Sequence, residues 1–184
     1  MHMAAIPALL ILGPAGCYTS SSMDSGPPDA GPECPLWGTS VFVDYVQAIS
    51  EPSEGFVTAT LRGGQQLRLD VQTTRGELWA EMLEFHRVEH KPVYLEIDDP
   101  GTMTIINLIM SLESPVHDVR TAAEGTEVEL VYSAAVHFLQ LSHPCYGQML
   151  AAIETAHREG SNVLVSADYN DGSRILDARE PLDP

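Results

Sequence analysis

The stretch LRLDVQTTRGELWAEMLEFHRVEHKPVYLEIDDPGTMTIINL, residues 67–108, contains the pattern from which the fold can be predicted. A stretch with the same order of features, HFLQLSHPCYGQMLAAIETAHREGSNVLVSADYNDGSRILDA, lies 70 residues later at 137–178. Shifting the chain by 70 positions superposes Leu69 on Leu139, although few identities survive. Because a fixed period indicates a repeated structural unit, the sequence predicts a tandem repeat.

Each repeat is expected to begin with three short strands. In the second of these, Val57, Ala59 and Leu61 alternate with polar neighbours, which is the period of two typical of a half-buried strand. The first repeat has its predicted strands near 41–49, 56–62 and 66–71, and the second near 115–121, 127–132 and 135–141.

A helix is expected after the third strand of the first repeat, near 76–90. Thr73 or Thr74 can cap its N-terminus, and Pro92 should end it because the residue before a proline avoids helical geometry. The predicted apolar stripe is Leu78, Trp79, Met82, Leu83 and either Phe85 or His86. Two further strands, near 93–97 and 104–109, flank the turn sequence DDPGT.

The second repeat follows the same order. Its helix should open at Ser142 or His143 with Pro144 in the first turn, and should end at Gly160. A hairpin over YNDG, residues 169–172, closes the repeat. The predicted apolar stripe of this helix is Met149, Leu150, Ile153 and Ala156.

The element order strand, strand, strand, helix, strand, strand resembles that of the OB-fold, a small five-stranded barrel. The resemblance implies a mostly β, α+β protein of two tandem βββαββ repeats, repeat 1 over 36–111 and repeat 2 over 112–184. The order is also similar to that of the B-subunits of bacterial AB5 toxins, which hold glycans. The alternative architecture is one α+β sandwich whose strands pair across the repeats, with both helices on one face.

The N-terminus indicates export. The apolar segment Ala4 to Leu12 is far shorter than the roughly 20 residues that span a bilayer, and is typical of the core of a secretory signal. The sequence Ala15-Gly16-Cys17 resembles the lipobox of bacterial lipoproteins, which implies a signal peptide over 1–16 and a lipid on the thiol of Cys17. The alternatives are a plain secretory signal and a cytosolic protein in which Cys17 is incidental.

Residues 17–35 are rich in Ser, Gly, Pro and Asp and have almost no apolar side chains to bury. This composition predicts a disordered tether between the anchor and the folded region. In the lipoprotein family an aspartate directly after the cysteine retains the protein in the inner membrane. Because Tyr18 stands there, the resemblance implies an outer-membrane-anchored lipoprotein, with a periplasmic or secreted protein as the alternative.

The charge balance excludes some partners. The chain has 26 acidic and 9 basic residues, for a formal net charge of -17. Such a field repels nucleic-acid phosphates and anionic lipid headgroups. We therefore expect no nucleic-acid partner, and membrane contact only through the lipid anchor.

The cysteines suggest one crosslink. If Cys17 carries a lipid, Cys34 and Cys145 remain, an even number in an oxidising compartment. They are candidates for a disulfide. The alternative is two separate thiols, since spacing alone does not say whether the two Cα atoms approach each other.

Catalytic and metal motifs are weak in this sequence. His86 and His90 lie four residues apart with Glu89 beside them, but the H-E-x-x-H pattern of zinc proteases is absent. The sequence DYNDG, 168–172, lacks the spacing of an EF-hand loop and is typical of a tight turn. The sequence also has no nucleophile elbow, dinucleotide fingerprint or P-loop. We expect no catalytic residues, no metal, no cofactor and no enzyme activity.

The OB-fold resemblance implies a binding surface on strands two and three. In the first repeat its outward side chains would supply hydroxyl, amide and guanidinium groups beside one aromatic ring, suited to a sugar or a peptide. The alternative is an ordinary solvated sheet face. The candidate ligand face consists of Phe56, Thr58, Thr60, Arg62, Gln66 and Arg68, with Asp70 at its end.

In the second repeat the corresponding face would present Val131 and Phe138, which are costly to leave in water. We expect this face to be covered by the other repeat or by another chain. The predicted function is a non-enzymatic, lipid-anchored binding module for glycan or protein at the cell envelope. The alternative function is a structural or assembly lipoprotein of an envelope complex.

Overall fold

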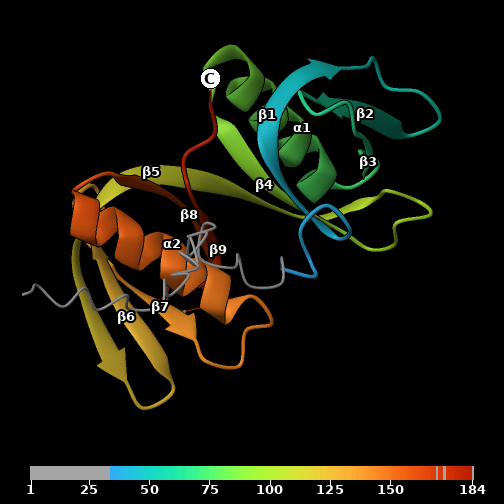
Figure 1. Cartoon of the computed structure of the whole chain (residues 1–184). Coiled ribbons are helices and arrows are strands. Elements are labelled where there is room, and N and C mark those ends of the chain that lie inside the picture. Colours follow the sequence, from blue (N-terminus) through green and yellow to red (C-terminus); the bar gives the residue numbers. More distant parts are fainter. Residues whose placement is uncertain (1–33, 169, 172, 184) are drawn as a thin grey trace, which may run out of the picture. The chain divides into compact units, whose positions relative to one another are not determined.

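The computed structural model describes residues 34–168, 170–171 and 173–183 (Figure 1). The predicted signal peptide, the lipidation candidate Cys17 and most of the predicted tether lie outside the described residues. Only Cys34 and Pro35 of the tether are described, and Cys34 is buried. The described part is mostly β, with two helices, one closed five-stranded mixed barrel and four outer strands.

The first half of the described chain supplies the four outer strands. In chain order its elements are β1 (Val41–Ile49), β2 (Phe56–Leu61), β3 (Gln66–Asp70), α1 (Thr74–Val88), β4 (Pro92–Ile97) and the long strand β5 (Ile105–Ala122). The strand order is β3-β2-β1-β4-β5, and each neighbouring pair is antiparallel. Among the described residues, one isolated parallel bridge joins Arg68 of β3 to Thr104, the residue before β5.

The second half forms the closed barrel. Its further elements are β6 (Gly125–Leu130), β7 (Val136–Gln140), α2 (Tyr146–Glu159), β8 (Asn162–Asp168) and β9 (Arg174–Arg179). The order is β5-β6-β7-β9-β8, and β8 pairs back onto β5. The β7–β9 pair is parallel and the others are antiparallel, so the barrel is mixed. Because these strands close on themselves, the alternative of a single sandwich is wrong.

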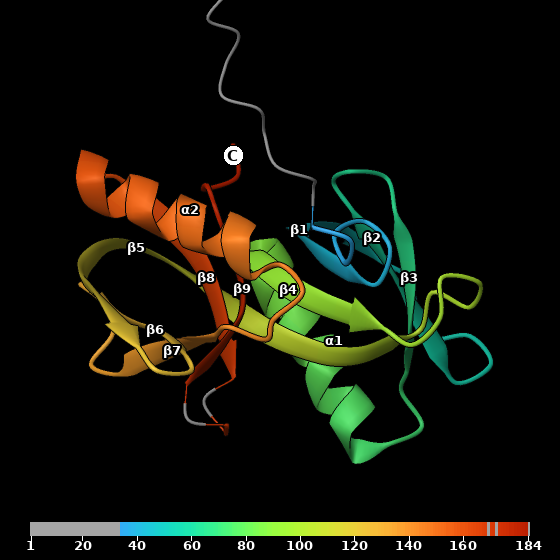
Figure 2. The same ribbon diagram turned by 60° about the horizontal axis from the view of Figure 1, so that its bottom comes forward.

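β5 runs through both halves as one strand of 18 residues (Figure 2). The sequence predicted two separate strands, near 104–109 and 115–121, and this prediction is wrong. The strand is continuous because its partners succeed one another along it: β4 pairs over 105–110, β8 over 111–115 and β6 over 116–122. The predicted boundary between the repeats therefore falls inside a strand.

The first helix begins as predicted and packs differently from the prediction. The hydroxyl of Thr73 accepts a hydrogen bond from the Gly76 N–H at 3.0 Å, which confirms the predicted cap. α1 packs chiefly against β1, so its buried stripe runs through Leu83 and His86. Leu78, a predicted member of the stripe, is exposed. Of the two alternatives Phe85 and His86, His86 is the buried one and Phe85 is exposed.

The second helix starts later than predicted and ends where predicted. It begins at Tyr146 because the imidazole Nδ1 of His143 accepts the Cys145 N–H at 3.1 Å, which holds residues 143–145 in a turn. Gly160 ends it with φ of 65°, a left-handed conformation that glycine adopts without strain. No helix among the described residues has the length and apolar character needed to cross a membrane.

The apolar core has two main parts and a small bridge between them. The first part lies between α1 and the outer strands, and includes Leu61, Leu67, Leu83 and Leu95. The second part lies between the barrel strands and α2, and includes Leu139, Met149, Ile153 and Ile175. The bridge consists of Val41, Val43, Tyr94 and Leu164, and joins β1 and β4 to β8.

Candidate functional site

The β2–β3 hairpin brings most of the predicted ligand face together. The buried inward side chains fix the register, because a slip of one residue would expose all of them to water. Those side chains are Val57, Ala59, Leu61, Leu67 and Leu69. The outward side chains lie opposite one another in three pairs, Phe56 with Asp70, Thr58 with Arg68, and Thr60 with Gln66. We name these six residues the β2–β3 face.

Arg68 and Phe56 organise the β2–β3 face. The guanidinium carbon of Arg68 lies 4.1 Å from the centroid of the Phe56 ring, a cation–π contact. Among the described residues, no carboxylate forms an ion pair with Arg68. The backbone N–H of Arg68 donates to the Met103 carbonyl at 2.8 Å, which places the β4–β5 loop beside the face. The side chain of Arg68 is thus oriented by an aromatic ring, with N–H donors available to a ligand.

Arg62 does not join the other predicted ligand residues. It follows the last residue of β2, and its guanidinium lies 4.6 Å from the centroid of the Tyr45 ring. It is 3.6 Å from the Asp44 carboxylate and donates to the backbone carbonyl of Asp183. With Arg87 it lines a separate cavity of about 350 Å³.

The two histidines considered for a metal site are in different environments. His86 is buried and its Nδ1 lies 3.3 Å from the Lys91 carbonyl, whereas His90 is exposed. Burial lowers the pKa of His86, because the charged imidazolium loses its hydration. Among the described residues, no group of three His, Cys, Asp or Glu side chains is placed to hold a metal ion.

The DYNDG sequence joins β8 and β9, which pair antiparallel as a hairpin requires. The carboxylate of Asp168 accepts the backbone N–H of Asn170 at 2.9 Å. Residues 169 and 172 lie outside the described residues.

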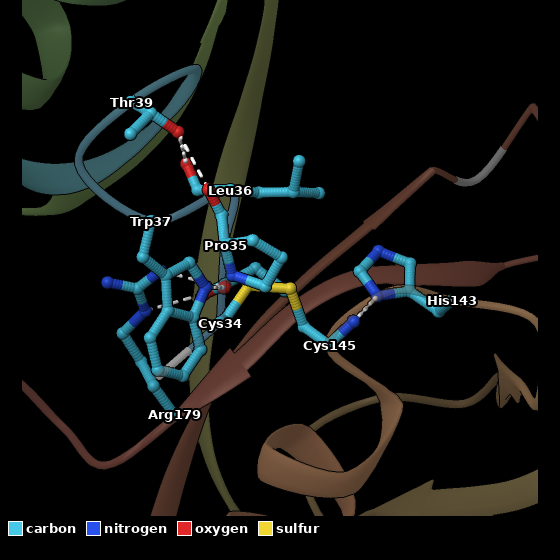
Figure 3. Close-up of a disulfide and its surroundings, with 9 residues drawn as sticks. Cys34, Pro35, Leu36, Trp37, Thr39, His143, Cys145 and Arg179 are labelled. Atoms are coloured by element: carbon cyan, nitrogen blue, oxygen red, sulfur yellow. Dashed lines mark hydrogen bonds and ion pairs between the residues drawn. A yellow bond between two sulfur atoms is a disulfide. The ribbon is translucent and has the colours of Figure 1, made fainter. Parts of the chain in front are cut away.

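Cys34 and Cys145 form a disulfide (Figure 3). Their Cα atoms are 4.9 Å apart, although 111 residues separate them in sequence. Both side chains are buried, and Cys145 is the N-cap residue of α2. The bond attaches the first described residue to the helix of the barrel.

A buried carboxylate beside the disulfide was missed by sequence reasoning. Asp177 accepts hydrogen bonds from the Trp37 indole and, through two nitrogens, from Arg179, each at 2.7 Å. The Arg179 guanidinium also lies 4.5 Å from the centroid of the Trp37 ring (Figure 3). No sequence signal joins residues so far apart. We name these three residues the Asp177 clamp.

The first half of the described chain does not cover Val131 on the outward face of the second half, and cover by another chain stays a prediction. Val131 is 52% exposed, so the described residues of the first half do not cover it. Phe138 is half-buried. Glu127 and Glu129 lie at the outward positions of β6, opposite Phe138 and Val136. This face is therefore acidic and apolar, unlike the β2–β3 face.

Comparisons with known proteins identify no relative of this chain. No protein-family profile, no curated protein and no solved structure matches it at a significant level. The geometry and charge of the described side chains are thus the basis on which a function can be assigned.

Proposed function

We propose that this protein is an exported, lipid-anchored binding module of the cell envelope, without enzymatic activity, whose β2–β3 face recognises a glycan or protein ligand. The observation that carries the proposal is the Arg68 guanidinium held over the Phe56 ring, with no carboxylate partner among the described residues. The chain has 26 acidic and only 9 basic residues, so a guanidinium without an acidic partner is notable. Around it Thr58, Thr60 and Gln66 supply hydrogen-bonding groups.

The fold of the first half supports the choice of this face. We infer that the chain is a tandem repeat of two OB-like units, in which strands two and three form the general binding surface. The Arg68 N–H donates to Met103, and its equivalent 70 residues later, the Phe138 N–H, donates to Ser173 at 3.2 Å. Both acceptor residues have left-handed backbones, with φ of 54° for Met103 and 58° for Ser173. Such a shared irregularity favours common ancestry of the two halves.

Two observations support export. The Cys34–Cys145 disulfide favours an oxidising compartment, because thiols are kept reduced in the cytosol. The Ala15-Gly16-Cys17 sequence resembles a lipobox, and a lipid on Cys17 would anchor the protein in the outer membrane.

The test of the binding function uses the full chain carrying Cys17→Ser, which cannot be lipidated. The protein is applied to a glycan array and to envelope proteins separated on a membrane. An Arg68→Gln variant should lose the ligand, because the planar guanidinium donors are removed. Arg158→Gln is the matched control, since Arg158 is an exposed arginine on α2. If both variants retain full binding, the β2–β3 face is not the site.

A structural role in an envelope complex is the second candidate, favoured by exposed apolar side chains. Leu78, Phe85 and Val88 are exposed on α1, and Val131 and Tyr132 are exposed at the end of β6. Exposed apolar clusters commonly mark protein contacts. Crosslinking in intact cells, followed by purification of the full chain, should recover a fixed set of envelope proteins if this candidate is right. Loss of that set in a Phe85→Glu variant would support it.

A further inference from the structure

The N-terminal third of β5 has an unpaired edge. Residues 105–110 pair with β4 along one edge. Along the other edge of β5, the Arg68–Thr104 bridge lies just before residues 105–110, and pairing with β8 begins just after them at Ser111. No second strand among the described residues pairs with 105–110. These residues therefore present a row of backbone N–H and C=O groups without strand partners.

A groove follows this edge. A cavity of about 300 Å³ is lined by Ile105 and Ile106, and a second of about 470 Å³ by residues 107–110. Successive side chains of a strand point to opposite faces of a sheet. A cavity lined by four consecutive residues therefore faces the edge of the strand. Arg75 and Trp79 line both cavities, so the two adjoin.

The groove lies between α1 and β5. α1 packs chiefly against β1, whereas α2 in the other half packs against β5 and β9. One wall of the groove is thus α1, through Arg75, Trp79 and Met82. The other wall includes Leu69 and Asp70 of β3 at one end, and at the other end Asp168, the last residue of β8, with Asn170 in the turn that follows. We name this feature the β5 groove.

We propose that the β5 groove binds an extended peptide segment of a partner protein, which adds to β5 as an extra strand. Backbone groups in a row at strand spacing are best matched by another backbone, which is the basis of recognition by strand addition. Trp79, Met82 and the exposed side chains Ile106 and Met110 provide apolar contacts for alternate residues of the peptide. This site shares only Asp70 with the β2–β3 face and does not depend on a ligand bound to that face.

Charge narrows the class of peptide. Asp70 lies at one end of the groove and Asp168 at the other, and the whole chain has a formal net charge of -17. Like charges are repelled by such a field and opposite charges are attracted. The peptide is therefore expected to have apolar residues at alternate positions and basic residues at its ends.

The walls favour a single extended chain over a second copy of this protein. A second copy presenting the same edge would bring its own α1 wall and its own β8–β9 turn against those of the first. A strand of six residues is about 20 Å long and needs no such flanking structure. A glycan would contact Trp79 and Asn170 but would leave the row of backbone groups unpaired.

The test starts from a phage-displayed library of random linear dodecapeptides, selected on the full chain carrying Cys17→Ser. The strongest peptide is then synthesised, and hydrogen exchange is measured by mass spectrometry with and without it. Slowed exchange within 105–110 is expected. N-methylation of the peptide, one residue at a time, should weaken binding at least tenfold at alternate positions, because only every second N–H faces β5.

Two variants complete the test. Met110→Lys should weaken peptide binding at least tenfold, whereas Val131→Lys should leave it unchanged. The two residues are matched in exposure, at 56% and 52%. Circular dichroism melting verifies that both variants are folded. If Met110→Lys is not folded, Trp79→Phe replaces it in the binding measurement. Arg68→Gln should not affect peptide binding, which separates this site from the β2–β3 face.

Several results would overturn the proposal. Selection of no peptide, exchange protection outside 105–110, or equal tolerance of N-methylation at every position would each do so. A concentration-dependent dimer that Met110→Lys abolishes would show that a second copy occupies the edge instead. Binding of sugars but not peptides, abolished by Trp79→Ala, would assign the groove to glycans.

Discussion

The indole Nε1 of Trp37 donates a hydrogen bond of 2.7 Å to Oδ1 of Asp177, a residue 140 positions further along the chain. Asp177 is only 1% exposed, and Arg179 balances its charge. This contact fastens the first described residues to the last strand of the barrel, and the disulfide fastens them to the start of α2.

Removing the buried carboxylate should destabilise the protein strongly. Asp177→Ala leaves the Arg179 guanidinium without its partner and the Trp37 N–H without an acceptor, so we expect a loss of about 3 kcal/mol in unfolding free energy. Asp171→Ala, at an exposed carboxylate paired with Arg174, is the control and should cost about 0.5 kcal/mol or less. Urea denaturation measures both. Equal costs would show that the Asp177 clamp contributes little.

Breaking the disulfide should also lower stability. It closes a long loop, with a sequence separation of 111, so the chain-entropy estimate of its contribution is about 4–5 kcal/mol. A variant carrying both Cys34→Ser and Cys145→Ser should unfold at a lower guanidinium concentration than the wild type. Adding dithiothreitol should shift the wild type to the same midpoint and leave the variant unchanged. A wild type that is insensitive to reductant would contradict this expectation.

Replacing Gly76 or Gly147 by alanine should change the unfolding free energy in opposite directions. Gly76 lies in the first turn of α1, where an added Cβ would overlap the backbone carbonyl of Asp70, so Gly76→Ala should destabilise by about 2 kcal/mol. Gly147 lies in the first turn of α2 with no atom within 4 Å of an added Cβ. Gly147→Ala should therefore stabilise, by up to about 1 kcal/mol, through helix propensity. Thermal melts of both variants give the two signs directly.

Stability should fall below pH 6.5, in part because of two buried histidines and one half-buried histidine. Burial lowers the pKa values of His86, His137 and His143 from 6.5, so the folded state holds these side chains neutral. The unfolded state therefore binds protons first as pH falls, and stability present above pH 6.5 is lost towards the lower folded pKa values. In the His86→Gln variant, the unfolding free energy should fall less steeply than in the wild type between about pH 7.5 and about pH 5, the range in which a histidine titrates.

The lipid anchor can be tested in living cells. Wild-type protein should become labelled by an alkyne analogue of palmitate, and Cys17→Ser should not. The variant carrying both Cys34→Ser and Cys145→Ser is the control and should keep its label, because Cys17 is intact. Labelling that survives Cys17→Ser would remove the lipid anchor from the proposed function.

The order of strands and helices was predictable because it depends on apolar periodicity and capping residues within short segments of the chain. Val57, Ala59 and Leu61 alternate with polar residues, and the structure buries all three in β2. Thr73 caps α1 and Gly160 ends α2, because capping depends on the few residues around a helix end. The period of two also places all six residues of the β2–β3 face on one side of the hairpin, as the strand register shows.

The pairing of distant segments could be decided only by the tertiary structure. The sequence predicts strands near 104–109 and 115–121 but not one continuous strand over 105–122, because continuity depends on β4, β8 and β6 pairing with it in succession. Arg62 alternates correctly with its neighbours and yet turns to Tyr45 and Asp44, which lie on another strand. The Asp177 clamp and the unpaired edge of β5 are likewise long-range features. Local periodicity fixes which residues face inward, whereas packing between segments far apart in the chain fixes which backbone groups remain free to bind.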